Sequence, residues 1–218
     1  MNQENCCGGG CCDEIETLGD DLTQFDQPVK IGDRVPNLPF DYFQNEAFHR
    51  GHMSDYKGKW VIVFFYPADF TFICPTELEE MAEHYAEFQK LGAEILGVSR
   101  DTKFVHKAWH DHSPAIKKIA YPMVADPTGE ISETFGVAIH SGEDAGLSLR
   151  GTFLINPDGE LVAYEVHANN IGRSAKEVLR KLEAAVFVRE HNGQEVCPAG
   201  WTKGGKTLKP GIDLVGKI

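Results

Sequence analysis

The sequence predicts an α/β fold, with a mixed central sheet flanked by helices and an irregular C-terminal arm. Three observations support this class. Apolar segments of strand length alternate with segments of helical periodicity over residues 60–135. The turn signal Asn156-Pro157-Asp158-Gly159 then joins two further strand-like segments, and an amphipathic helix follows. From His191 the chain is rich in glycine and proline. Strands that alternate with helices and end in a hairpin indicate one mixed sheet with helices on its faces.

The first predicted strand and helix lie on either side of a cysteine. Trp60–Tyr66 is continuously apolar and rich in β-branched and aromatic residues, as expected for a strand buried on both faces. Residues 76–91 form a predicted helix that Gly92 stops. Its apolar residues at helical spacing are Leu78, Met81, Ala82, Tyr85 and Phe88. Pro75 suits the first helical position, which places Cys74 at the cap.

The rest of the chain continues the alternation. Strands are predicted at residues 93–99, 121–125, 151–155 and 160–166, and helices at residues 102–112 and 128–135. Ser174 and Glu177 have the spacing of a capping box, which begins the last helix. The apolar face of that helix consists of Val178, Leu179, Leu182, Ala185 and Val186. We expect a flexible cysteine-rich extension at residues 1–28, one domain at residues 29–190 and an arm at residues 191–218.

The composition argues against several classes of protein. The 218 residues carry a formal net charge of −12, whereas nucleic-acid binding uses basic patches. No apolar run approaches the roughly 20 residues that a membrane-spanning helix needs. The first residues have neither the basic nor the apolar region of a secretory signal, so we expect a cytoplasmic protein. Six cysteines in such a reducing compartment indicate thiols with chemical roles.

Cys74 is the strongest functional signal in the chain. It follows a buried strand and stands where a helix begins. Backbone N–H groups are unpaired at a helix N-terminus, and the positive end of the helix dipole lies there. Both effects favour the thiolate over the thiol. A cysteine at such a place therefore suits nucleophilic chemistry.

The residues around Cys74 match a known signature. Pro67, Thr71 and Cys74 have the spacing Pro-x-x-x-Thr-x-x-Cys, and residues 64–78 resemble the peroxiredoxin family closely. Cys197 resembles the resolving cysteine of its typical two-cysteine subfamily. Residues 30–218 share the resemblance. Two segments, His106-Lys107-Ala108-Trp109-His110 and Asp213-Leu214-Val215-Gly216-Lys217-Ile218, are most similar to the peroxidase components of bacterial alkyl hydroperoxide reductases.

The resemblance implies a thioredoxin-like fold and a thiol peroxidase. Cys74 would reduce hydrogen peroxide or an alkyl hydroperoxide and become a sulfenic acid. Cys197, from a partner subunit as in the family, would condense with it to a disulfide. No flavin or nicotinamide motif is evident, so we expect no cofactor. The implied reductant is a flavoprotein subunit of alkyl hydroperoxide reductase or thioredoxin, and the implied assembly is a dimer that forms decamers.

Five further residues take site roles by the same resemblance. Arg150 matches the active-site arginine, which would favour the thiolate and bond the peroxide oxygens. Thr71 would bond the thiolate and the substrate, and Pro67 would shield the pocket from water. Glu77 would orient Arg150, while Arg173 is either a second cation of the site or a loop contact.

Other readings stay open beside the peroxidase. A thioredoxin-type disulfide reductase needs a second cysteine where Glu77 stands. A ring-forming holdase chaperone, or a metal-binding protein with secondary peroxidase activity, is the alternative. His106 and His110 have a metal-pair spacing, but without a third ligand we expect ordinary surface histidines. The cysteine-rich extension could bind a soft metal, carry an extra dithiol or be an incidental tail. Its cysteines are Cys6, Cys7, Cys11 and Cys12.

Overall fold

The computed structural model describes residues 27–217, so the cysteine-rich part of the predicted extension lies outside the described residues. The strands are β1 (Pro39–Gln44), β2 (Ala47–His52), β3 (Trp60–Phe65), β4 (Ala93–Ser99), β5 (Met123–Ala125), β6 (Arg150–Ile155) and β7 (Leu161–His167). The α-helices are α1 (Cys74–Glu83), α2 (Tyr85–Lys90), α3 (Lys103–His112), α4 (Glu130–Thr134) and α5 (Ala175–Glu190). Short 3₁₀ turns, η1 to η3, cover Met53–Tyr56, Ile116–Lys118 and Ile212–Leu214.

The seven strands form one mixed sheet in the order β2-β1-β5-β4-β3-β6-β7. The central neighbours β3, β4 and β5 run parallel, and the outer pairs are antiparallel. All six residues of β3 are buried, because the strand lies in the middle of the sheet and both of its faces are covered. The predicted class, an α/β fold with a mixed sheet, is therefore confirmed.

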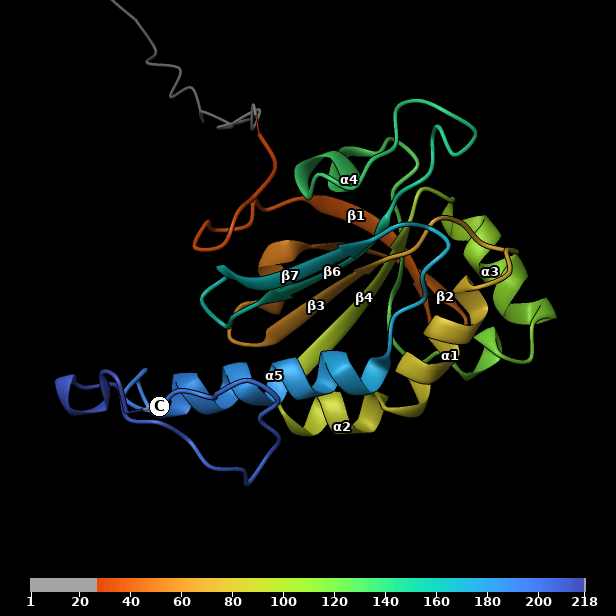
Figure 1. The fold of residues 1–218 in the computed structure, drawn as a ribbon. Coiled ribbons are helices and arrows are strands. Elements are labelled where there is room, and N and C mark those ends of the chain that lie inside the picture. The colour runs from red at the N-terminus through yellow and green to blue at the C-terminus, as the bar shows by residue number, and fades with distance from the viewer. Residues whose placement is uncertain (1–26, 218) are drawn as a thin grey trace, which may run out of the picture.

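Two apolar clusters lie on the two faces of the sheet. Ile62 and Phe64 point into one cluster, together with Leu78 of α1 and Leu182 of α5. The alternate positions of β3 point into the other cluster, which includes Ile131 of α4. Figure 1 shows the same arrangement, with α1, α2 and α5 below the sheet and α4 above it. Successive side chains of a strand point to opposite faces of the sheet, so a central strand contributes to both clusters.

The predicted helix at residues 76–91 is two helices. It breaks at His84, whose ψ of 1° is not helical, and α2 then runs from Tyr85. The helix also begins earlier than predicted, because Cys74 is its first residue and Ile73 is the cap. Only helical periodicity was visible in the sequence, and both helices present their apolar residues to the same face of the sheet, so the pattern did not reveal the break.

Two local features differ from the sequence analysis. The hairpin of β1 and β2 was missed, although Asn45 and Glu46 form its two-residue turn with φ values of 50° and 59°. The predicted capping box at α5 is not formed. The Ser174 hydroxyl instead lies 3.4 Å from Glu80 of α1, so a tertiary contact replaces the local one.

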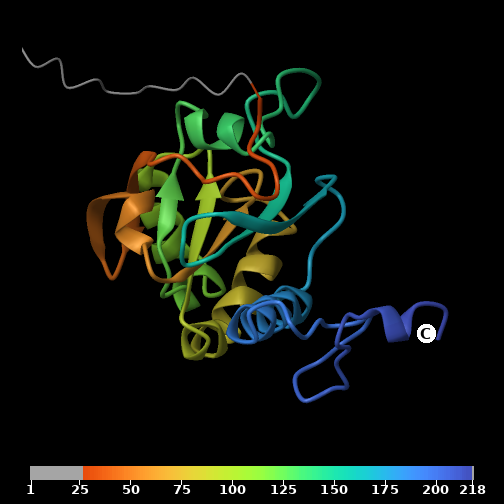
Figure 2. The ribbon, with the colours of Figure 1, turned by 90° about the vertical axis from the view of Figure 1, so that its left-hand side faces the viewer.

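The chain after α5 is irregular. Its backbone pairs Val196 with Leu208 in an isolated bridge, and a 3₁₀ turn follows at Ile212–Leu214. Figures 1 and 2 show this segment extending beyond the body of the fold alongside the end of α5. Among residues 27–217, none of the helices is both long enough and apolar enough to span a membrane.

Candidate active site

Cys74 lies at the N-terminus of α1, close to the carboxyl end of the central strand β3. It is 0% exposed, and its thiol is free. The loop that carries it leaves β3 after Tyr66, whose backbone N–H still bonds Val98 of β4. The apolar strand and the amphipathic helix thus hold this thiol away from bulk water, at the positive end of the helix dipole.

Two arginines from distant parts of the chain meet at this helix. Arg150, the first residue of β6, directs its Nη1 to the Cys74 Sγ at 3.4 Å. The same Nη1 donates to Glu77 Oε2 at 2.6 Å, and the Arg150 Nε donates to the Asn169 carbonyl. Arg173 donates to Glu77 from its backbone N, its Nε and its Nη2, at 2.7, 2.9 and 3.1 Å. Glu77 is therefore the shared acceptor of both cations.

These buried groups are unbalanced in charge while Cys74 is a thiol. Arg150, Arg173 and Glu77 are 3%, 7% and 3% exposed. Two guanidinium groups and one carboxylate sum to +1, and a Cys74 thiolate would bring the four groups to zero. A buried charge is costly unless it is paired, so a negative group beside Arg150 would complete the charge balance of this cluster.

Ionisation of the neighbouring groups agrees with this arrangement. Burial opposes the charged form of Glu77, but the hydrogen bonds and charge of Arg173, and then the charge of Arg150, hold the pKa of this carboxyl below its usual range. Burial lowers the pKa of Arg173 from its ordinary high value, although Glu77 opposes that shift. The Arg173 guanidinium also lies 3.5 Å from the centre of the Phe64 ring, which covers its face.

Cys197 lies in another part of the fold. Its Sγ is 3.9 Å from the Ala184 carbonyl of α5, and it lines a hollow with Trp60, the first residue of β3. Burial raises the pKa of the Cys197 thiol, and the charge of Arg180 opposes this shift. The two cysteines are thus near opposite ends of β3.

Comparison with known proteins decides the family. Residues 31–164 match the AhpC/TSA family, and residues 187–213 match the C-terminal domain of 1-Cys peroxiredoxin. The chain is 53% identical over 189 residues to alkyl hydroperoxide reductase C of Amphibacillus xylanus, covering 86% of this chain and 98% of that protein. The chain belongs to the AhpC/TSA family of peroxiredoxins. It is a thiol-dependent peroxidase, and this membership favours that activity over the holdase alternative.

Solved peroxiredoxin structures agree with the fold. Enterococcus faecalis AhpC superimposes with a TM-score of 0.73 at 46% identity, covering 78% of this chain and 99% of that one. The reduced 2-Cys peroxiredoxin of Plasmodium vivax gives a TM-score of 0.79 at 31% identity, covering 85% and 96%. The predicted thioredoxin-like fold is therefore confirmed.

The other residues expected from the peroxiredoxin motif lie in the loop before Cys74. The Thr71 hydroxyl donates to the Ala68 carbonyl at 2.8 Å, and Pro67 is buried directly after Tyr66. The expected bond from Thr71 to the sulfur is not among the hydrogen bonds of the described residues. The structure thus brings Arg150, Glu77 and Arg173 to the thiol's helix, and holds Thr71 within its own loop.

Sequence reasoning missed a buried polar cluster that anchors the same loop of this peroxiredoxin. Asp69 accepts a hydrogen bond from the Tyr66 hydroxyl at 2.8 Å and lies 2.7 Å from His106 Nδ1. The expectation that His106 and His110 are surface histidines was wrong, because they are 0% and 9% exposed. Burial raises the pKa of Asp69, and the hydrogen bond and charge of His106 oppose this shift. The sequence signal that could have indicated this buried cluster was a charged residue, Asp69, within the aromatic run 64–72.

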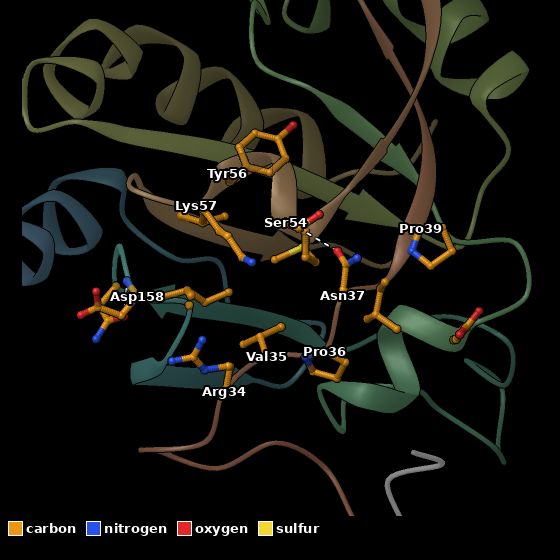
Figure 3. Close-up of a pocket in the computed structure, with 16 residues that line it drawn as sticks. Arg34, Val35, Pro36, Asn37, Pro39, Ser54, Tyr56, Lys57 and Asp158 are labelled. Carbon is orange, nitrogen blue, oxygen red and sulfur yellow. Dashed lines mark hydrogen bonds between the residues drawn. The ribbon is translucent and has the colours of Figure 1, made fainter. Parts of the chain in front are cut away.

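A separate hollow of about 480 Å³ lies away from the thiol. Figure 3 shows its lining from the segment before β1, the turn η1 and the β6–β7 turn, with Arg34, Lys57 and Asp158 at its edges. The backbone N–H of Ser54 donates to Asn37 Oδ1 across it. None of the predicted catalytic residues lines this hollow.

Replacing Glu77 with glutamine should destabilise the protein by about 3–5 kcal/mol, because it leaves two buried guanidinium groups without their counter-charge. Chemical denaturation would measure the change in the free energy of unfolding. Glu79→Gln is the matched control. Glu79 lies on the same helix and pairs with Lys118 at the surface, so about 0–1 kcal/mol is expected. Equal losses in the two variants would contradict a special role for Glu77.

The Glu77 pKa also sets the sign of a pH effect. A carboxyl whose pKa is lowered by folding stabilises the native state above its ordinary pKa, about 4.3, and that contribution disappears as the pH falls through the lower folded value. The stability difference between the wild-type protein and Glu77→Gln should therefore shrink as the protein is acidified below about pH 4. Denaturation curves at several acidic pH values would measure the free energy of unfolding of both proteins. A difference between them that did not change with pH would contradict an ionised Glu77 in the native state.

Proposed function

We propose that the protein reduces hydrogen peroxide and alkyl hydroperoxides through a sulfenic acid at Cys74 and a disulfide between Cys74 and Cys197. The observation that carries this proposal is the Arg150 Nη1 at 3.4 Å from the Cys74 Sγ, in a buried cluster that a thiolate brings to neutrality. A thiolate at this place is a nucleophile. It accepts a hydrogen bond from Arg150, which would also donate to the bound peroxide.

In the first step, the Cys74 thiolate attacks the terminal oxygen of the peroxide. The S–O bond forms as the O–O bond breaks, and the other oxygen leaves as water or an alcohol after taking a proton. Thiolate formation alone raises the reactive fraction by only about 30-fold at pH 7, so most of the rate must come from stabilising charge on the leaving oxygen. Arg150 is the donor positioned for that role.

Thr71 and Pro67 complete the proposed pocket. The Thr71 hydroxyl donates its hydrogen bond to the Ala68 carbonyl, so its oxygen is left as an acceptor for the peroxide O–H. Pro67 is buried and has no backbone N–H to satisfy, which supports its expected role of shielding the pocket from water. Glu77 acts through Arg150, because it accepts a hydrogen bond from that guanidinium, and Arg173 acts through Glu77, to which it donates. We assign them as positioning residues.

In the second step, the Cys197 thiolate attacks the sulfenic sulfur, and the hydroxyl leaves as water. A disulfide needs Cα atoms about 4.4–6.8 Å apart, whereas β3, with a length of about 17 Å, separates the neighbourhoods of the two thiols. This supports pairing between chains, in a homodimer whose arms each serve the partner's site. The burial of Cys74 requires the first turn of α1 to open before the disulfide can form.

The cycle closes when a reductant restores both thiols. Among the relatives, those named alkyl hydroperoxide reductase C support a reductase partner for this chain. A flavoprotein reductase subunit and thioredoxin are the two candidates, since each delivers electrons as a dithiol. A cytoplasmic location and assembly of the dimers into a decamer belong to the same proposal, and a thiol-reducing compartment suits the free Cys74 and Cys197.

Replacing Cys197 with serine tests the two-cysteine cycle. The variant should consume about one peroxide per chain and then stop, because its sulfenic acid has no resolving thiol. Stopped-flow measurement of peroxide loss, together with non-reducing electrophoresis, would follow both steps. The wild-type protein should form a covalent dimer that the variant does not form. Normal turnover of Cys197→Ser with its protein reductant would contradict the cycle, while a missing first burst would contradict the role of Cys74.

A further inference from the structure

A buried histidine nitrogen on α3 lacks a hydrogen-bond partner. His110 is 9% exposed, and its ring packs against Phe43 with 5.2 Å between the ring centres. Its Nδ1 is buried and makes no hydrogen bond with the described residues. Most buried polar atoms in proteins are satisfied, so this nitrogen has room for a further partner beside the Glu46 carboxylate at 3.5 Å.

Two carboxylates lie around this histidine. Glu46, at the β1–β2 turn, brings its Oε1 to 3.5 Å from His110 Nδ1, and Asp111 is the next residue of α3. One ligand atom from each of the three side chains lies within 4.8 Å of the others. Ligands of one zinc ion, each about 2.1 Å from it, are at most about 4.2 Å apart. Both carboxylates are exposed, so small side-chain rotations close this difference.

We propose that His110, Glu46 and Asp111 form a binding site for a divalent transition-metal ion such as Zn²⁺, with water in the remaining position. An imidazole nitrogen with two carboxylates suits Zn²⁺ better than the all-oxygen preference of Mg²⁺ or Ca²⁺. The pair of histidines at i, i+4 is not the site. His106 is already held by Asp69 and by the Val124 carbonyl, which leaves neither of its ring nitrogens for a metal.

A lysine competes with the ion for this site. The Lys107 Nζ lies 2.6 Å from Asp111 Oδ2, one helical turn before it, and both side chains are about 40% exposed. A metal ion must displace this surface ion pair, which weakens binding modestly because such pairs are worth about 0.2–1 kcal/mol, or up to about fivefold in affinity. Removing the lysine charge should therefore strengthen metal binding, whereas removing a ligand should weaken it.

The proposed ion would join two elements of the fold. It would tie the β1–β2 turn to the last turn of α3, and α3 also carries His106, which contacts Asp69 of the active-site loop. An ion that binds only the folded chain stabilises it by mass action, so the melting temperature should rise with metal concentration. This effect does not depend on peroxidase chemistry.

The test is a Zn²⁺ titration of the full reduced chain by calorimetry, with the melting temperature measured in parallel. His110→Gln should lower the affinity of this site at least about 10-fold, and Lys107→Gln should raise it by up to about fivefold. His140→Gln is the matched control. His140 forms an exposed pair with Glu133 and should leave the binding unchanged. Co²⁺ absorption separates this site from the N-terminal cysteines, because thiolate ligands give strong charge-transfer bands and imidazole and carboxylate ligands do not.

Each outcome bears on the proposal. The proposal is supported if His110→Gln binds one fewer ion per chain with nitrogen and oxygen ligands, and if its melting temperature no longer rises with metal concentration. Equal metal stoichiometry and equal stabilisation in the wild-type protein and His110→Gln would overturn it. If His110→Gln does not fold, Glu46→Gln replaces it, because Glu46 is on an exposed turn and outside the core. Unchanged Zn²⁺ affinity in Glu46→Gln would also overturn the proposal.

Discussion

Cys74→Ser is expected to reduce peroxide turnover to the background rate, in single-turnover as well as steady-state assays. The serine hydroxyl is not ionised near neutral pH, so the buried Arg150 would face a neutral and weakly nucleophilic oxygen where the sulfur stands. Peroxide consumption with and without an added reductant would measure the loss.

Loss of turnover in Cys74→Ser reports on the sulfur only if that variant is folded. Cys74→Ala is a second substitution that tests this, because alanine leaves no polar atom in the buried position, and circular dichroism with thermal melting would compare both variants with the wild-type protein. A fast peroxide burst that survived in both variants would place the peroxidatic sulfur elsewhere, at Cys197 or among the N-terminal cysteines. Such a burst would contradict the proposed function directly.

Arg150→Ala is expected to slow the reaction with peroxide by about 10²–10³-fold, the loss seen when one donor to a developing anion is removed. The informative measurement is the rate at alkaline pH, well above about 8.5, the ordinary pKa of a cysteine thiol. If the deficit persists there, Arg150 stabilises the transition state as well as the thiolate. Stopped-flow rate–pH profiles of both proteins would give the comparison.

Arg189→Ala is the matched arginine control for this experiment. Arg189 pairs with Asp158 and lines the hollow of the other cysteine, Cys197, so its variant should keep the wild-type rate of the first step, the reaction of Cys74 with peroxide. Full recovery of the Arg150→Ala rate at high pH would show that Arg150 only promotes ionisation. Because Arg150 also neutralises Glu77, the free energy of unfolding should be measured in the same preparation, so that loss of folded protein is not counted as loss of catalysis.

Most of the secondary structure was predictable because it depends on local periodicity. The buried strand β3, the strand β4 and the helix α3 have boundaries within one residue of the expected ones, and the two strands are largely apolar runs. The hairpin of β1 and β2 was missed because five of the six residues of β2 are exposed, so this strand has no buried apolar alternation. The break at His84 was missed because tertiary packing decides whether two short helices join.

The sequence alone determined the family and placed the proposed nucleophile, Cys74, at the start of a helix. The Pro-x-x-x-Thr-x-x-Cys signature is contiguous, so residues 67–74 carry it without knowledge of the fold. It also indicated Arg150, Glu77 and Arg173, but only through resemblance, and it left open whether Arg173 belongs to the site.

The tertiary structure decided how these groups act together. Arg150 is 76 residues from Cys74 and Arg173 is 96 residues from Glu77, and only the sheet brings β6 and the loop before α5 to the same helix. These groups are buried, so each charge needs a partner, because an unpaired ion is costly away from water. Packing in the fold also buries His106 and His110, which were expected at the surface. His106 contacts Asp69 of the loop before Cys74, and His110 is a candidate metal ligand. Sequence spacing indicates which residues share a helix, whereas burial and partners depend on the packed fold.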